Sequence, residues 1–212
     1  IYLTCEKIES GDLNLDDKIV ASETAASMGG SQVFIEANAE YSIGDLLKST
    51  IVSSANDASV ALAETIAGSE ESFVALMNKK ANEIGLKDTN FVTPHGLDSD
   101  EHYTTAYELA LLTDYALNNQ IFRTIVSTKV YNIYINGVSR TITNTNELLG
   151  YLNGVYGVKT GFTDNAGYCM AVTAKRDGMR LIAITLGEES GKVRNSETTE
   201  LLDYGFNLYK VD

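Results

Sequence analysis

The chain has 212 residues, of which 29 are acidic and 16 basic, so its net charge is −13. This length suits one domain, and 44% hydrophobic with 21% charged residues is typical of a globular chain, which excludes a disordered or fibrous protein. Lys and Arg form no cluster, and this argues against nucleic acid or an anionic membrane surface as a partner, because both need a basic footprint. No apolar run approaches the roughly 20 residues of a membrane helix.

The N-terminal region is predicted to contain one helix followed by loops. Residues 1–8 have helical spacing of apolar side chains, and Gly11 is a suitable stop. Residues 12–42 carry Gly, Ser and Asn and are only weakly periodic, so we expect loops with edge strands. The clearest short strand lies at 18–21, and 33–35 is a further apolar stretch.

Two consecutive buried helices are predicted next. Apolar residues recur at helical spacing over 43–52, and Ser42 with Asp45 forms a start that resembles a capping box. A helix of mostly small residues follows at 58–67 and ends at Gly68.

A further amphipathic helix is predicted over about 73–84. The loop 90–104 that follows it contains the single proline and both histidines of the chain. The pattern Thr105-x-x-Glu108 then predicts a capped helix that runs to Leu117.

From Lys129 onward the apolar period changes to two, which is typical of strands. An Asn-Gly turn predicts a hairpin over 130–143, and an Asp-Gly turn predicts a second one over about 167–186. A helix over about 201–208 closes the chain. Helices followed by strands joined through tight turns predict an α+β fold with an antiparallel sheet.

No repeat or low-complexity linker divides the chain, so we expect one domain over 1–212. Its helical part covers about 42–128, and its sheet part covers about 129–212 together with the N-terminal helix.

The histidines and cysteines are weak candidates for chemistry. His95 and His102 have no Ser or Cys nucleophile motif nearby in sequence, so ordering of their loop is the favoured interpretation. Cys5 and Cys169 lie in apolar stretches and behave as small buried residues there. Their spacing from the histidines fits no metal site, and nothing in the sequence calls for a cofactor.

A serine and an amide, Ser54-x-Asn56, stand at the break between the two buried helices. Taken alone, this pattern favours helix capping, with Asn56 or Asp57 as the N-cap residue.

A lysine stands between glycines on a predicted strand, in the run Lys159-Thr160-Gly161. Strands seldom bury lysine, so this pattern indicates a ligand brought close to bare backbone. An edge strand with a lysine that blocks unwanted pairing explains it equally well.

Together and in this order, about 100 residues apart, the two motifs resemble the second and third signatures of the penicillin-recognising serine enzymes. Further stretches make the chain similar, over nearly its whole length, to low-molecular-mass D-alanyl-D-alanine carboxypeptidases. These stretches are Ser54-Ala55-Asn56-Asp57, 90–97 with Pro94-His95-Gly96-Leu97, His102-Tyr103-Thr104-Thr105-Ala106, Asn144-Thr145-Asn146 and 157–168.

The resemblance implies a β-lactamase/DD-peptidase-like fold with a mostly helical subdomain. It also implies a serine-type carboxypeptidase that removes the terminal D-Ala from peptidoglycan stem pentapeptides through an acyl-serine intermediate, in cell-wall maturation. Its partners would be stem peptides ending in D-Ala-D-Ala, with β-lactams as inhibitors. Its place would be outside the cytoplasm, secreted or anchored to the membrane by a segment beyond Asp212.

The resemblance also assigns roles to residues. Ser54 would pass the proton to the leaving amine, and Lys159 would supply positive charge near the substrate carboxylate and tune that relay. Thr160 would bond the carboxylate, the Phe162 N–H would complete an oxyanion hole, and Asn56 would hold the substrate amide or the neighbouring lysine. The catalytic residues implied are Ser54 and Lys159, and the substrate-binding residues are Asn56, Thr160, Gly161 and Phe162.

The chain departs from the family pattern in one respect. The first signature, Ser-x-x-Lys, carries the nucleophile and its base, and no lysine in these 212 residues has a serine three positions before it. Residues 1–4 resemble the helix just after that lysine. We therefore expect the nucleophile, its lysine and two strands to lie upstream of Ile1, and residues 1–212 alone to be inactive.

Two alternatives remain open. A serine β-lactamase is the nearest enzyme, but no Glu-x-x-Leu-Asn segment is present, and Ala55 stands where the class A signature has Asp. The other alternative is a non-catalytic homologue that binds the peptidoglycan peptide without being acylated.

Overall fold

The computed structural model describes residues 1–209. The helices within them are α1 (Tyr2–Glu9), α2 (Glu23–Ala26), α3 (Ile43–Val52), α4 (Asn56–Ala67), α5 (Glu70–Ile84), α6 (Ala106–Ala116), α7 (Gln120–Val126) and α8 (Gly191–Leu208). The strands are β1 (Lys18–Val20), β2 (Glu40–Ser42), β3 (Val130–Ile135), β4 (Val138–Thr143), β5 (Val155–Thr163), β6 (Gly167–Arg176) and β7 (Met179–Glu188).

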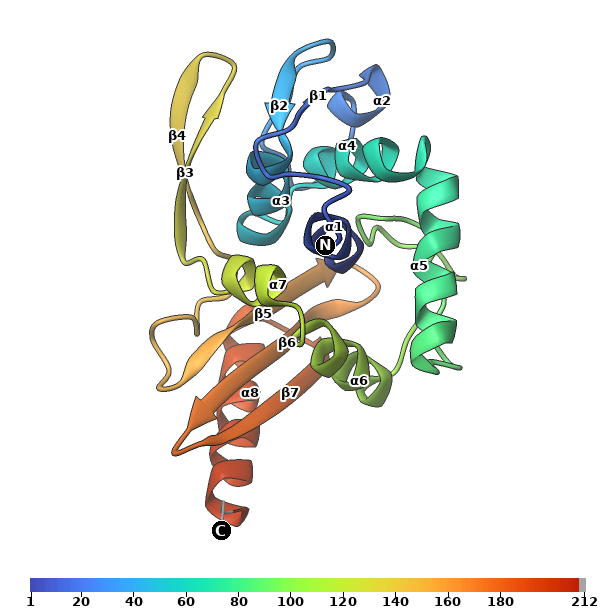
Figure 1. The fold of residues 1–212 in the computed structure, drawn as a ribbon. Coiled ribbons are helices and arrows are strands. Elements are labelled where there is room, and N and C mark those ends of the chain that lie inside the picture. Colours follow the sequence, from blue (N-terminus) through green and yellow to red (C-terminus); the bar gives the residue numbers. More distant parts are fainter. Residues whose placement is uncertain (210–212) are drawn as a thin grey trace.

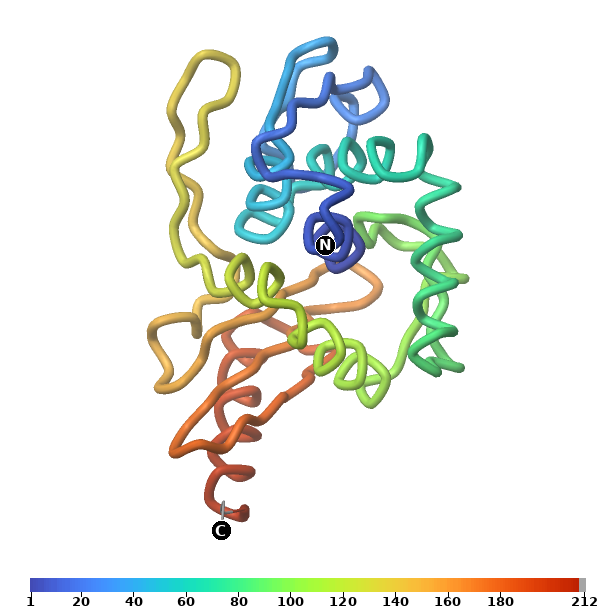
Figure 2. Tube along the Cα trace, in the orientation of Figure 1, coloured from blue at the N-terminus to red at the C-terminus, as the bar shows by residue number. Residues whose placement is uncertain are grey.

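The fold is α+β, as predicted. Strands β5, β6 and β7 form an antiparallel sheet in sequential order, while β1–β2 and β3–β4 form two separate antiparallel pairs. In Figure 1 helix α8 lies against one face of the three-stranded sheet, and α6 and α7 lie on the other. The remaining helices gather at the opposite end of the molecule, and the tube in Figure 2 shows α8 extending away from them.

Helix α3 lies at the centre of the larger core, because its apolar side chains are fully buried on all sides. These residues are Ile43, Leu46, Leu47, Ile51 and Val52. The predicted cap is confirmed: the Ser42 hydroxyl accepts from the Asp45 N–H at 3.0 Å. Helices α4 and α5 end at Gly68 and Gly85, both with the left-handed backbone that favours glycine.

The predicted cap of α4 is wrong. Ala55 is the N-cap residue, and no side chain caps it. The buried Asp57 carboxylate turns to the segment before β2, where it accepts from the N–H groups of Val33 at 3.2 Å and Ile35 at 3.1 Å. These loop N–H groups have no strand partner, so the carboxylate satisfies them instead.

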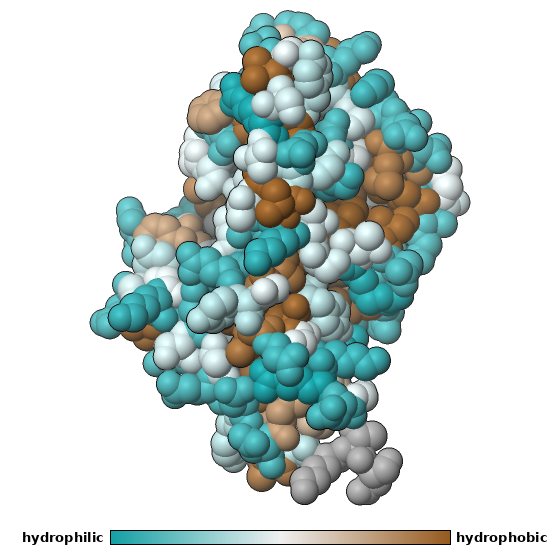
Figure 3. Space-filling model, turned by 90° about the vertical axis from the view of Figure 1, so that its left-hand side faces the viewer, coloured by the Kyte–Doolittle hydropathy of each residue, from teal (hydrophilic) through white to brown (hydrophobic). Residues whose placement is uncertain are grey.

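Both predicted hairpins are confirmed, and β3–β4 packs on the helical core. Ile133 and Ile135 are buried in that core, and the Tyr131 hydroxyl donates to Asp45 at 2.7 Å. In Figure 1 this hairpin rises beside α3 and β2, away from the three-stranded sheet. Figure 3 views the molecule from the side of the hairpin and shows apolar residues interrupted by hydrophilic ones.

Several short elements differ from the sequence prediction. Helices α2 and α7 were not predicted, and strand β2 lies within 12–42, where edge strands were expected but not at this place. Helix α8 begins at Gly191, ten residues earlier than expected. None of the helices within residues 1–209 combines the length and apolar character needed to cross a membrane.

Candidate active site

Ser54 and Lys159 meet, although they are 105 positions apart in the chain. Lys159 lies in the middle of β5, and its Nζ donates to the Ser54 Oγ at 2.8 Å and to the Thr160 carbonyl at 2.8 Å. Ser54 occupies the turn between α3 and α4 with a φ of 59°, in the left-handed region that a non-glycine residue rarely adopts. Strained backbone of this kind clusters at functional sites.

The Lys159 ammonium is desolvated and has no counter-ion. Burial lowers its pKa to about 8, and the neighbouring Arg194 charge acts in the same direction. Within residues 1–209 no carboxylate forms an ion pair with Lys159. A buried cation without a counter-ion, with a second cation nearby, favours the binding of a negatively charged group.

Arg194 is a site residue that the sequence analysis missed. Its side chain is 6% exposed, and its Nε and NH2 donate to the Asn195 Oδ1 at 3.1 and 2.9 Å. Asn195 in turn donates to the Glu147 carboxylate at 2.6 Å. Burial lowers the pKa of Arg194, with Glu147 working against that shift.

One signal in the sequence points to Arg194. It follows the helix cap Ser190 by four residues and therefore lies near the N-terminus of α8, where the helix dipole disfavours a cation. A basic residue in such a place needs another reason, and the effect of its charge on Lys159 is one.

The residues of both motifs line one cavity of about 760 Å³, which we call the site cavity. Its walls come from the turn at Ser54, from β5 and from the loop before α6. The lining includes Ser54, Asn56, His95, Lys159, Thr160 and Phe162.

Strand β5 presents one free edge in this region. Within residues 1–209 it pairs only with β6, so the backbone groups of its other edge are open to a ligand strand. Gly161 and Phe162 lie on this strand, and Phe162 is 53% exposed with its ring 4.3 Å from the ring of Tyr168. The turn after β5 is tied to the loop before α6, since the Thr163 hydroxyl donates to Asp98 at 2.6 Å.

Asn56 reaches the site cavity, but its side chain has another partner. The Asn56 Nδ2 donates to the Gly29 carbonyl at 2.8 Å, and its backbone N–H donates to the Ser31 carbonyl at 2.8 Å. A Cβ at Gly30 would lie 2.6 Å from that Nδ2, so only glycine fits there. Asn56 therefore fastens the segment 29–31 to the cavity wall.

The histidines line the site cavity without touching Ser54 or Lys159. The His95 Nε2 lies 3.7 Å from the Glu70 carboxylate, and the His102 Nδ1 accepts from the Val92 N–H at 3.3 Å. Burial lowers the pKa of both rings. These contacts fit histidines that order their loop. Residues 1–209 contain no group of three or more His, Cys, Asp or Glu side chains placed to hold a metal ion.

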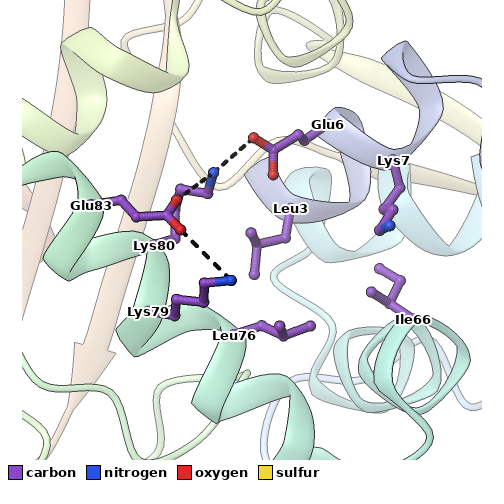
Figure 4. A pocket seen from close by; sticks show the side chains of 8 residues that line it. All are labelled: Leu3, Glu6, Lys7, Ile66, Leu76, Lys79, Lys80 and Glu83. Atoms are coloured by element: carbon purple, nitrogen blue, oxygen red, sulfur yellow. Dashed lines mark hydrogen bonds and ion pairs between the residues drawn. The ribbon is translucent and has the colours of Figure 1, made fainter.

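A second, smaller hollow of about 140 Å³ between α1 and α5 provides a comparison (Figure 4). There the Lys80 Nζ contacts Glu6 at 2.9 Å and Glu83 at 3.0 Å. The hydrogen bond to Glu6 raises the pKa of Lys80, the opposite of the shift at Lys159. Lys80 is neutralised by its neighbours, whereas Lys159 is not, and this difference marks the site cavity as the place for an anionic ligand.

Comparison with known proteins agrees with this geometry. Residues 1–190 match the family model for D-alanyl-D-alanine carboxypeptidases. The chain belongs to the D-alanyl-D-alanine carboxypeptidase family.

Relatives within this family match nearly the whole chain. The D-alanyl-D-alanine carboxypeptidase DacF of Bacillus subtilis is 42% identical over 214 residues, which covers 100% of this chain and 54% of DacF. Penicillin binding protein 5 from Haemophilus influenzae superposes with a TM-score of 0.90 at 35% identity, covering 97% of this chain and 60% of that one. Penicillin-binding protein D2 from Listeria monocytogenes, in its ampicillin-bound form, gives 0.85 at 30% identity, with coverages of 97% and 83%. The chain thus spans about half the length of DacF.

Proposed function

We propose that the protein containing this chain is a serine D-Ala-D-Ala carboxypeptidase that acts outside the cytoplasm on peptidoglycan stem peptides. The observation that carries the proposal is the 2.8 Å contact between Lys159 and Ser54 beside the open edge of β5, in a chain of this family. Because these 212 residues contain no Ser-x-x-Lys, we propose that the nucleophile comes from a part of the protein outside them.

The substrate strand pairs with the free edge of β5, so that its terminal carboxylate reaches Thr160 and the charges of Lys159 and Arg194. The carboxylate supplies the counter-ion that Lys159 lacks, which favours the protonated form of Lys159. A chain of net charge −13 can therefore bind an anionic peptide end, because binding depends on the positive charges at the site and not on the net charge of the chain.

In acylation a C–O bond replaces a C–N bond, and one proton is transferred. The nucleophilic serine oxygen bonds to the carbonyl carbon of the penultimate D-Ala, with the Phe162 N–H stabilising the oxyanion. The C–N bond then breaks, and the proton given up by the serine reaches the leaving amine through Ser54. Ser54 is free to donate because its oxygen accepts from Lys159. Water later hydrolyses the ester and restores the serine hydroxyl.

A labelling experiment tests this function. The complete protein should be labelled covalently by a fluorescent penicillin and should release D-Ala from a stem pentapeptide. Residues 1–212 alone should remain unlabelled. Ser54→Ala should lower the acylation rate by about 10²- to 10⁴-fold, the range typical of a lost proton-transfer group. Ser53→Ala, one position earlier in the turn, is the matched control.

The same experiment separates the alternatives. Absence of labelling in a complete protein that still binds the pentapeptide would identify a non-catalytic binding homologue. Rapid loss of the label with turnover of the penicillin would identify a β-lactamase. Labelling of residues 1–212 alone would show that the nucleophile lies within them.

A further inference from the structure

The loop between β4 and β5 holds one threonine in a defined place. Asn144 and Asn146 on either side of it are buried, at 7% and 2% exposure. The Asn144 Nδ2 donates to the Thr128 carbonyl at 2.9 Å, and the Asn144 Oδ1 accepts from the Asn146 N–H at 2.9 Å. Because the two asparagines fix the loop backbone, the position of the exposed Thr145 between them is fixed as well.

Thr145 contacts both motif segments of the site. Its N–H donates to the Val52 carbonyl at 3.0 Å, at the end of α3 just before the Ser54 turn. Its Oγ1 lies 2.6 Å from the Thr160 Oγ1 on β5. No other step of the proposed function uses Thr145.

Binding of a carboxylate determines which of the two hydroxyls is the donor in the hydrogen bond between Thr145 and Thr160. Each hydroxyl has one hydrogen to donate, and a carboxylate only accepts. If Thr160 donates to the substrate carboxylate, it has no hydrogen left for Thr145, so Thr145 must donate to Thr160. A donor bonded to Thr160 in this way also strengthens the bond that Thr160 makes.

We infer that Thr145 is a positioning residue that acts through Thr160: its hydroxyl orients the Thr160 hydroxyl toward the terminal carboxylate and so contributes to selectivity for a free peptide carboxyl end. This inference rests on the proposed function. In this role Thr145 acts on the substrate only through its contact with Thr160. Its side chain is exposed, so replacing its hydroxyl leaves no buried polar group without a partner.

The test compares variants of the complete protein. The measurements are the second-order rate of acylation by penicillin, and kcat and KM for a peptide with a terminal carboxylate and for the same peptide with a terminal amide. Thr145→Val should lower kcat/KM for the carboxylate peptide by about 3- to 10-fold, the value of one hydrogen bond, and should leave the amide peptide unchanged. Thr145→Ser keeps a hydroxyl and should restore most of the loss. Thr143→Val, an exposed threonine of β4, is the matched control.

The double variant decides whether Thr145 works through Thr160. In a Thr160→Val background, Thr145→Val should have no further effect on the carboxylate peptide. An equal loss with and without Thr160, or an equal loss for carboxylate and amide peptides, would overturn the inference while the proposed function stands. If the unmodified protein is neither acylated nor active, the proposed function fails, and the inference fails with it.

Discussion

The Lys159 ammonium is destabilised by its surroundings. Its amine is desolvated beside a second cation, and its pKa falls to about 8 from an ordinary value of 10.5. Folding therefore makes protonation of Lys159 less favourable than in the unfolded chain, although the ammonium, the form that binds an anion, still predominates at pH 7. A site prepared for a negative ligand is destabilising while it is empty, which is the usual conflict between function and stability.

Removal of this charge should change how stability depends on pH. Between pH 8 and pH 10.5, Lys159 is more protonated in the unfolded chain than in the folded one, because its pKa is about 8 when folded and near 10.5 when unfolded. The free energy of unfolding therefore increases with pH in this range. Lys159 opposes folding fully below pH 8, and this penalty disappears as the pH rises toward 10.5. Lys159→Met should therefore be more stable than the unmodified protein at pH 7, by a margin that shrinks toward pH 9.5. Urea unfolding of both proteins across this range measures it.

An exposed lysine of the neighbouring strand provides the control. Lys175→Met should give a curve of stability against pH parallel to that of the unmodified protein. A constant difference between Lys159→Met and the unmodified protein over the whole range would contradict the lowered pKa of Lys159.

Part of the site follows from sequence alone. Each local pattern drew attention to Ser54 or Lys159 but had a structural explanation of its own, and only the order and spacing of the two motifs, through the family resemblance, predicted their roles. Arg194 was missed because the closing helix was expected to begin near residue 201, which left Arg194 in a loop where a cation is ordinary. The Gly29 partner of Asn56 depends on a contact 27 positions away, which no local pattern encodes.

Among the elements, α7 depends on a single residue at its start. Asn119 is 3% exposed, and its Oδ1 accepts from the Phe122 N–H at 2.8 Å, which makes it the N-cap. Its Nδ2 donates to the Glu9 carboxylate at 2.8 Å, at the end of α1. One side chain thus starts α7 and fixes α1 against it.

Asn119→Ala should destabilise the protein by about 1–3 kcal/mol, because it removes a helix cap and a partly buried hydrogen bond to a carboxylate. Asn119→Asp should lose less than the alanine variant at the cap but should place a like charge against Glu9. Denaturant unfolding at neutral pH measures both variants. Asn118→Ala, one position earlier and exposed, should change the free energy of unfolding by less than about 0.5 kcal/mol. Equal effects at the two positions would contradict the role of Asn119.

Elements with strong local signals were predicted, and those formed by distant contacts were not. The Asn136-Gly137 turn and the Ser42 cap determine their elements through residues next to each other in sequence. Helix α2 has only four residues, and β2 has three, paired with β1 across 20 to 24 positions. Short elements of this kind are stable only through the packing around them, so their own residues carry little information.

At the scale of the whole molecule, the excess of 13 negative charges opposes compaction. Raising NaCl from 10 to 150 mM shortens the screening length from about 30 Å to about 8 Å, so repulsion between distant carboxylates should weaken. The midpoint of thermal unfolding at pH 7 should rise by a few degrees, which for a protein of this size corresponds to about 1 kcal/mol.

The same change of salt concentration at acid pH is the control for this prediction. Near pH 4.5, the isoelectric point of the sequence, the net charge vanishes and the same salt change should have little effect on the midpoint. A decrease of the midpoint with salt at pH 7 would show that attractive ion pairs outweigh the net repulsion.

The unpaired edge of β5 also affects which other polypeptide chains can bind to this protein. An open edge strand attracts any extended chain, including a second copy of the same protein, and is an aggregation hazard. Here a neutral strand that added to β5 would leave the desolvated Lys159 charge without a counter-ion, which is a free-energy penalty. Only a strand that ends in a negative charge escapes this penalty. Under the proposed function, Lys159 therefore favours peptide ends over neutral strands at this edge. The two explanations that its sequence context allowed, a guard against unwanted pairing and an anchor for a ligand, are then compatible.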